Sequence, residues 1–175
     1  MILALGESQP KLGSNCFVAE GAVVVGDVEL SEHASVWYGA VVRADENRIR
    51  IGARTNVQDL CALHVDGDNC LRIGADVTIG HGAVVHGCSI ADRVLVGMGA
   101  IVMNGADIGR DTIVGAGAIV TEGTKVPPCS LVLGVPAKVR RELADEEIAA
   151  IVASARDYVK TASLHLERAK GRSGG

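Results

Sequence analysis

The stretch VGMGAIVMNGADIGRDTIVGAGAIVTEGTKVPPCSLV, residues 96–132, places an aliphatic side chain at every sixth position. Toward the N-terminus the same step of six recurs, in blocks separated by short changes of register. The full series is Leu12, Val18, Val24, Leu30, Val36 and Val42; Ile51, Val57 and Leu63; Ile73, Ile79 and Val85; then Ile90, Val96, Val102, Ile108, Val114, Val120, Val126 and Val132. Four positions after these aliphatics the residues are mostly small: Ala22, Ala34, Ala40, Ala83, Ser89, Ala100, Ala106 and Ala118.

This hexapeptide repeat predicts an all-β solenoid, in which each hexad forms one short flat strand with its aliphatic side chain pointing inward. Three such faces close a triangular coil of about 18 residues, and the coils stack at about 4.8 Å. Twenty hexads give six to seven coils, which we expect to form a β-helix domain over residues 1–140. The repeat resembles that of left-handed parallel β-helices, although the period alone does not fix the hand.

The composition agrees with a narrow interior. Hydrophobic residues make up 48% of the 175-residue chain, yet aromatic residues make up only 2%, and there are 22 glycines. Small and β-branched side chains fit inside a triangular prism, whereas aromatic rings do not. The net charge of −4 offers nucleic acid no basic surface, so we expect no nucleic-acid partner.

A different periodicity follows the last hexads. Over residues 143–169 the apolar residues recur at helical spacing, at Ile148, Ile151, Val152, Ala155, Val159, Ala162 and Leu166. Asp145 suits the N-cap position of this helix, and Glu146 and Glu147 are favourable in its first turn. We expect the helix to pack alongside the solenoid, and we expect residues 170–175 to form a disordered tail.

Targeting signals and cysteine usage predict a cytoplasmic protein. The first ten residues, MILALGESQP, have neither the basic region nor the long apolar run of a signal peptide. No segment approaches the roughly 20 apolar residues of a membrane span. The five cysteines lack CxxC spacing, which indicates reduced thiols and not a disulfide framework.

Counting faces along the repeat places two histidines in one column. Val42, Leu63 and Val85 should occupy the same face in successive coils, so the residues that follow them, Arg43, His64 and His86, should stack. By strand alternation these side chains point outward, and the two histidines should lie about 5 Å apart at the backbone. That separation suits two ligands of one metal ion.

His81 falls on the preceding face, two residues after its aliphatic, and should stack on Asp59. Its direction near the corner differs from that of the histidine pair, so we expect a second chain to complete the site. In a threefold assembly each site would combine a histidine pair from one chain with His81 of its neighbour. Three histidines and one open position form a catalytic zinc pattern.

The remaining candidates have simpler interpretations. We expect His33 and His165 to be solvated surface residues, and Cys88 to be structural because its column holds no second thiol. Trp37 and Tyr38 could either line a pocket beside Gln58 or pack between subunits, and the sequence leaves both interpretations open.

The motifs resemble those of the γ-class carbonic anhydrase family over nearly the whole chain. They are RADE at 43–46, NVQD at 56–59, His64 and HGAVVH at 81–86, with VGMGA at 96–100 and GVPAK at 134–138. GVPAK also occurs in hexapeptide acyltransferases, so NVQD followed by a histidine and then HxxxxH carries most of the likeness.

The resemblance implies a homotrimer that converts CO₂ reversibly to bicarbonate at three intersubunit metal sites. His64 and His86 of one subunit and His81 of the next would bind Zn²⁺, with Fe²⁺ or Co²⁺ as alternatives. Gln58 would hydrogen-bond the metal-bound hydroxide, and Asn56 would help to shape the CO₂ pocket.

The resemblance also implies supporting roles. Tyr158 matches a family tyrosine that approaches the metal-bound ligand. Arg43 and Asp59 would form a salt bridge between subunits, with Asp45 as a further partner. Glu46 matches a family glutamate that could carry protons.

One loop departs from the family's archaeal prototype, which carries a glutamate proton shuttle. The corresponding insertion here, VDGDNC at 65–70, contains Asp66 and Asp68 but no glutamate, as in a short-loop subgroup of the family. Three alternatives stay open: an acyl-CoA thioesterase, a hexapeptide acyltransferase-like enzyme with a histidine base, and a non-catalytic, metal-binding trimeric scaffold. The physiological substrate and the native metal are not fixed by the sequence.

Overall fold

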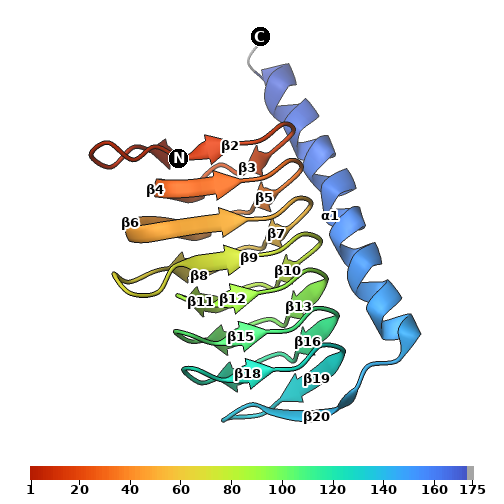
Figure 1. Ribbon diagram of the computed structural model, residues 1–175. Coiled ribbons are helices and arrows are strands. Elements are labelled where there is room, and N and C mark those ends of the chain that lie inside the picture. Colours follow the sequence, from red (N-terminus) through yellow and green to blue (C-terminus); the bar gives the residue numbers. More distant parts are fainter. Residues whose placement is uncertain (173–175) are drawn as a thin grey trace.

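The computed structural model describes residues 1–172, with side chains described through residue 168. Within that range the chain winds twenty short strands into a parallel β-solenoid of about seven turns and ends in a single helix, α1 (Asp145–Arg172). Figure 1 shows the turns stacked from the N-terminal end, with α1 returning along the outside of the stack. The predicted fold class is confirmed.

The strands form three faces, which we call A, B and C. Face A contains β1 (Ile2–Leu3), β8 (Ala62–His64), β11 (Val84–His86), β14 (Ile101–Val102) and β17 (Ile119–Val120). Face B contains β2 (Lys11–Leu12), β9 (Leu71–Ile73), β12 (Ser89–Ile90), β15 (Asp107–Ile108) and β18 (Lys125–Val126). Two long strands, β4 (Val23–Leu30) and β6 (Val41–Ile51), begin on face A and continue onto face B, so the two faces form one sheet.

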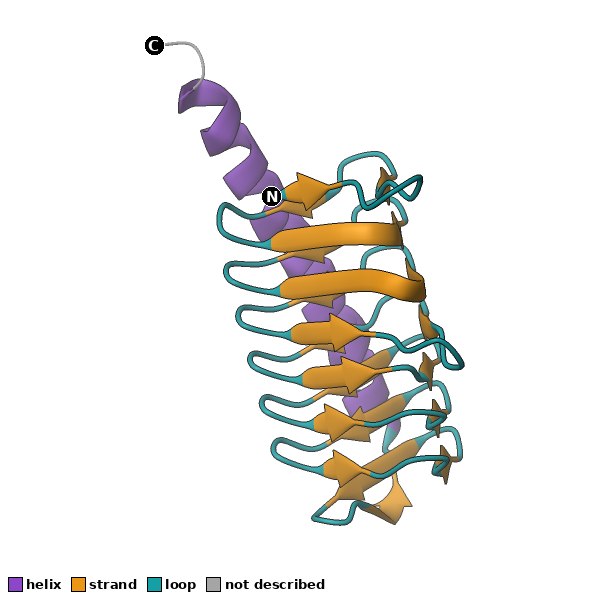
Figure 2. Ribbon diagram, turned by 90° about the vertical axis from the view of Figure 1, so that its left-hand side faces the viewer, coloured by secondary structure: helices purple, strands orange, loops and turns teal. Residues whose placement is uncertain are grey.

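Face C is a separate sheet that ends in an antiparallel strand. It contains β3 (Phe17–Val18), β5 (Ser35–Val36), β7 (Asn56–Val57), β10 (Thr78–Ile79), β13 (Val94–Val96), β16 (Thr112–Val114) and β19 (Ser130–Leu133). The last strand, β20 (Lys138–Glu142), pairs antiparallel with β19 and closes the solenoid. Figure 2 shows the strands of successive turns stacked as rungs, with α1 running obliquely behind them.

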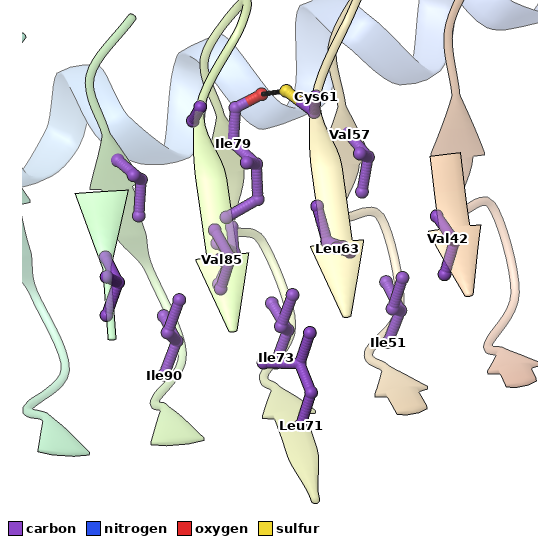
Figure 3. Close-up of a cluster of buried hydrophobic side chains, with 14 of the residues drawn as sticks. Val42, Ile51, Val57, Cys61, Leu63, Leu71, Ile73, Ile79, Val85 and Ile90 are labelled. Atoms are coloured by element: carbon purple, nitrogen blue, oxygen red, sulfur yellow. Dashed lines mark hydrogen bonds between the residues drawn. The ribbon is translucent and has the colours of Figure 1, made fainter. Parts of the chain in front are cut away.

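The register of the strands confirms the counting of faces from the sequence. Val42 pairs with Leu63 and Leu63 with Val85, so the hexad aliphatics stack in columns inside the prism. Figure 3 shows these side chains pointing inward from successive turns. Cys61 occupies a small inward position in the same interior, where its thiol donates to the carbonyl of Gly80 at 3.1 Å.

The helix begins later and ends further along the chain than the predicted range of 143–169. Leu143 is still attached to the solenoid, because its N–H donates to the carbonyl of Cys129 at 2.8 Å. Glu147 Oε2 accepts the N–H of Ala144 at 2.9 Å, which satisfies a free backbone donor at the helix start. Residues 170–172, predicted to belong to a disordered tail, continue the helix; the rest of that tail lies outside the described residues.

Aromatic residues hold α1 against the N-terminal turns of face C. Phe17 and Trp37 pack edge to face, and both lie against His165 of α1. His165 Nδ1 is 2.8 Å from the hydroxyl of Tyr38. Tyr158 of α1 packs on the same Trp37 ring, at 5.3 Å between centroids. The solvated position predicted for His165 is therefore wrong, and within this chain Trp37 and Tyr38 contact α1.

No helix in the described part of the chain combines the length and the apolar character needed to cross a membrane.

Candidate metal centre

His64 and His86 are neighbours in adjacent rungs of face A. They end β8 and β11, and the strand register pairs them directly, as the face count predicted. His64 Nδ1 and His86 Nε2 face each other at 2.9 Å, with the ring centroids 4.8 Å apart. The rings therefore present one nitrogen each to a common point outside the solenoid.

The other nitrogen of each ring is held by an oxygen acceptor. His64 Nε2 lies 2.9 Å from Asp45 Oδ1, and His86 Nδ1 lies 2.5 Å from Asn104 Oδ1. Metal-binding histidines usually donate their remaining N–H to such a carboxylate or carbonyl oxygen, which fixes the tautomer. If both rings are neutral, these two contacts assign the protons to the outer nitrogens and leave a lone pair on each facing nitrogen.

Two lone pairs that face each other at 2.9 Å repel unless a cation or a proton lies between them. Two nitrogen ligands of one tetrahedral Zn²⁺ stand about 3.3 Å apart, given Zn–N bonds of about 2.0–2.1 Å. A small rotation of the two rings would open that distance. The side chains present therefore fit two ligands of a divalent metal ion.

His81 has the same type of support but lies away from the pair. It follows β10, and its Nδ1 is 2.8 Å from Asp59 Oδ2, which leaves Nε2 free. Its side chain is 47% exposed. Among the described residues, no three histidine, cysteine, aspartate or glutamate side chains converge within this single chain. The structure brings His64 and His86 together and leaves His81 at a separate corner.

Gln58 and Asn56 form a buried network beside His81. Gln58 Oε1 accepts the backbone N–H of His81 at 3.1 Å, and Gln58 Nε2 donates to Asn56 Oδ1 at 3.1 Å. Asn56 Nδ2 in turn donates to Thr78 Oγ1 at 2.9 Å. The Gln58 amide is thereby held in one orientation, with one of its two N–H bonds not used by these contacts.

The charged residues near the histidines pair within the chain. Arg43 forms an ion pair with Asp45, which also accepts from His64. Burial raises the pKa of the Asp45 carboxyl, but hydrogen bonds from His64 and Arg43 outweigh it and leave that pKa below its ordinary value. Asp59 pairs with His81, so the expected contact between Arg43 and Asp59 of different subunits stays a prediction.

Two further candidates lie close to these groups. Tyr158 is half-buried, and burial together with the nearby Asp59 carboxylate raises the pKa of its hydroxyl. Glu46 is exposed and lines a pocket of about 260 Å³ together with Asp27 and Asp45. Cys88 is buried, and burial raises the pKa of its thiol to about 12, which disfavours the thiolate that a metal would need.

Sequence reasoning missed Asn104, which holds His86, and gave Asp66 no role beyond its not being a glutamate. Asn104 Nδ2 donates to Asp66 Oδ2 at 2.5 Å, across 38 positions of sequence. Asn104 lies two residues after the inward Val102, in the rung next to His86. Extending the face count to the second residue after each aliphatic would have found it.

An apolar pocket of about 360 Å³ opens beside Gln58 and His81, between face C and α1. Its lining residues are Gln58, Thr78, Gly80, His81, Leu95, Val96, Gly97, Met98, Ile113, Gly115, Ala116 and Ser154. Gly80, Gly97 and Gly115 are the residues that directly follow the inward aliphatics of β10, β13 and β16. Backbone therefore forms much of the pocket floor.

Comparison with known proteins places the chain in a family. No protein-family model matches it. It is 57% identical over 149 residues to a "Probable carbonic anhydrase" of Methanocaldococcus jannaschii, covering 85% of this chain and 94% of that protein. It is 40% identical over 165 residues to "Gamma carbonic anhydrase 2, mitochondrial" of Arabidopsis thaliana, covering 91% of this chain and 59% of that protein.

Among solved structures, a Bacillus cereus protein provisionally described as an acetyltransferase superposes with a TM-score of 0.92 at 39% identity. The match covers 94% of this chain and 95% of that chain. The fold is thus the left-handed β-helix of hexapeptide-repeat proteins. Because the archaeal relative is matched over nearly its whole length, the chain belongs to the γ-class carbonic anhydrase family.

Proposed function

We propose that the protein hydrates CO₂ reversibly to bicarbonate at a metal ion shared between subunits. His64 and His86 of one subunit and His81 of its neighbour would hold the ion. The observation that carries this proposal is the pair of facing ring nitrogens at 2.9 Å, each fixed from behind by an oxygen acceptor. Zn²⁺ bound there, with Fe²⁺ or Co²⁺ as alternatives, would lower the pKa of water toward about 7 and so supply a hydroxide nucleophile.

The protein's own groups would orient the reacting oxygens. The Gln58 amide is anchored at both ends, by the His81 N–H and by Asn56, and its remaining N–H can donate to an oxygen of CO₂ or bicarbonate. Asn56 is fully buried and keeps that amide in place. Tyr158 would approach the same oxygens from α1, and Glu46 would carry the released proton toward solvent.

The position of His81 supports an assembly in which a neighbour completes the site. Leu60 lies next to this corner with φ of +61° and 73% of its surface exposed, whereas the equivalent corner position is glycine at Gly39, Gly82, Gly99 and Gly117. A leucine in that backbone conformation costs about 1–2 kcal/mol, and its exposure gains nothing in an isolated chain.

Further exposed apolar side chains lie at the corner of Leu60 and on the outside of face A. Met98 at the same corner is 60% exposed, and Val41 and Val84 on the outside of face A are 38% and 37% exposed. Contiguous exposed apolar residues mark interaction sites. A homotrimer that buries them would bring the corner of one subunit to face A of the next, with Arg43 and Asp59 paired across the contact.

The protein's own thiols support a cytoplasmic location as part of this proposal. All five cysteines lie within the described residues and are unpaired. Free thiols are typical of a reducing compartment.

The test combines metal analysis with CO₂ hydration by stopped flow on metal-replete protein. We expect one metal ion per subunit and measurable hydration. The variant Gln58→Ala should keep the metal and lose rate, whereas His81→Ala should lose the metal because two ligands remain. His33→Ala, which changes a histidine far from the pair, serves as the control. Metal-replete protein that shows no hydration in any buffer would refute the proposal.

The apolar pocket favours ester or thioester hydrolysis as a second candidate. CO₂ has only three heavy atoms and would fill a small part of this pocket of about 360 Å³, since one water molecule takes up about 30 Å³ of liquid. Such a volume lies at the lower end of small-molecule sites. Acyl-CoA thioester hydrolysis measured on the same metal-replete protein distinguishes this activity from hydration. Acyl transfer to an acceptor, or metal binding with no turnover at all, would indicate an acyltransferase or a scaffold.

A further inference from the structure

The loop of residues 65–70 reaches the candidate metal centre through hydrogen bonds. We propose that Asp66 of this loop is a positioning residue which, through the Asn104 amide, fixes His86 in the tautomer whose Nε2 can bind metal. This inference rests on the proposed metal site and gives the loop a purpose other than proton transfer.

The contacts form one continuous chain. His86 Nδ1 lies 2.5 Å from Asn104 Oδ1, and Asn104 Nδ2 donates to Asp66 Oδ2 at 2.5 Å. The second oxygen, Asp66 Oδ1, accepts the backbone N–H of Asp68 at 3.0 Å and the backbone N–H of Asn69 at 2.8 Å. It also accepts from Asn69 Nδ2 at 3.0 Å. Both carboxylate oxygens are therefore engaged, one by the loop and one by Asn104.

The chemistry of these groups fixes which one donates and which one accepts each hydrogen bond. An ionised carboxylate only accepts hydrogen bonds, so Asn104 must turn its NH₂ group toward Asp66. The amide oxygen of Asn104 then faces His86, and His86 Nδ1 must carry the ring proton to donate to it. The lone pair of the neutral ring is left on Nε2, the nitrogen that faces His64.

The surrounding residues hold the loop in this position. Asn47, in the bent part of β6, donates from Nδ2 to the carbonyls of Asp66 and Gly67 at 3.2 and 3.1 Å. Gly87 has φ of +48°, and a Cβ there would stand 2.6 Å from Asn104 Oδ1. Asn47, the loop and Asn104, which are distant in sequence, thus form one network that reaches the outer nitrogen of His86 through Asn104.

The substitution Asp66→Asn separates the two roles of the carboxylate. The amide at position 66 still has an oxygen that can accept the N–H groups of the loop. Its NH₂ group would face the NH₂ group of Asn104, so the Asn104 amide would turn over and present N–H to His86. His86 would then carry its proton on Nε2 and oppose metal binding.

Two further variants make the test specific. Asp68→Asn removes one charge from the same loop, at a residue that contributes its backbone N–H to these contacts, and it is the matched control. The double variant Asp66→Asn with Asn104→Asp reverses the order of acceptor and donor. The carboxylate at position 104 can accept from both His86 and position 66, which restores the tautomer.

The experiment measures Zn²⁺ affinity by competition with a chromophoric chelator, using the full-length protein. We expect Asp66→Asn to bind Zn²⁺ about 10- to 100-fold more weakly, Asp68→Asn to match the wild type, and the double variant to recover most of the loss. Equal affinity of Asp66→Asn and Asp68→Asn would overturn the inference, as would a failure of the double variant to recover.

A second readout in metal-free protein separates this inference from the proposed function. The ¹⁵N shifts of the imidazole of His86, assigned with His86→Gln, report which nitrogen carries the proton. We expect Nδ1–H in the wild type and Nε2–H in Asp66→Asn. Wild-type protein that binds no metal would refute the metal centre alone, whereas an unchanged tautomer in Asp66→Asn would refute the role of Asp66.

Discussion

Gly87→Ala tests whether the support behind His86 controls the metal site. The glycine follows His86 directly and has φ of +48°, in the left-handed region. A Cβ at this position would stand 2.6 Å from Asn104 Oδ1 and 2.7 Å from Asn69 Cβ. The Asn104 amide would have to move by about 0.8 Å to reach ordinary contact at 3.4 Å.

Two effects follow from this geometry, and a control separates them. Left-handed backbone costs an alanine about 1–2 kcal/mol wherever it occurs. Gly117 has φ of +66° with nothing within 4 Å of its would-be Cβ, so Gly117→Ala carries the backbone strain without the collision. A shift of Asn104 would also break its 2.5 Å contact with His86, and loss of such support weakens metal binding about 10- to 100-fold.

The assay measures thermal unfolding and Zn²⁺ affinity of both variants beside the wild type. We expect both variants to unfold at a lower temperature and only Gly87→Ala to lose metal affinity. If the two variants bind Zn²⁺ equally well, then Asn104 does not support the site and the reasoning from this geometry is refuted.

Three other predictions concern the assembly and the helix. Arg43→Ala should weaken the trimer because Asp59 would lose its proposed partner across the interface; a variant that stays trimeric on dilution in the ultracentrifuge, with unchanged melting, would contradict this. Hydrogen bonds from the Arg141 guanidinium and the Ala144 N–H lower the pKa of the Glu147 carboxyl from 4.5 to about 2. The ionised Glu147 carboxylate should contribute its full stabilisation above the unfolded-state pKa and lose it as pH falls toward 2. The difference in melting temperature between wild type and Glu147→Gln should therefore vanish over that range. Truncation after Glu142 removes α1, and burial of its Ile151 side chain alone contributes about 2 kcal/mol. The melting temperature should therefore fall by at least about 5 °C. Unchanged melting would show that α1 does not stabilise the solenoid.

The fold was predictable because a hexapeptide repeat fixes the register of every rung. Once Val42, Leu63 and Val85 are assigned to one face, the direct pairing of His64 with His86 follows without further information. The separation of His81 from the pair of His64 and His86 followed for the same reason, because a side chain at a corner points in a different direction from one within a face.

The contact between the loop of residues 65–70 and Asn104 was not predictable, because it depends on an insertion that interrupts the repeat. The path of residues 65–70 carries no period, and Asp66 meets Asn104 only because that loop extends past the rung of His86 to the rung of β14. The surroundings of His165 likewise depend on how α1 rotates about its own axis, and the apolar positions of a helix leave that rotation loosely determined.

Division of the three histidines between a face and a corner has a thermodynamic consequence. If the third ligand comes from a neighbour, metal binds the assembled form more tightly than the separate chains, and by linkage metal must stabilise the trimer. A site loaded at 100 times its Kd adds about 2.7 kcal/mol to the assembled state. Chelation should therefore raise the protein concentration below which the trimer dissociates, and His81→Ala should abolish the effect. A trimer equally stable with and without metal, measured by ultracentrifugation on dilution, would place all the ligands of the ion within one chain.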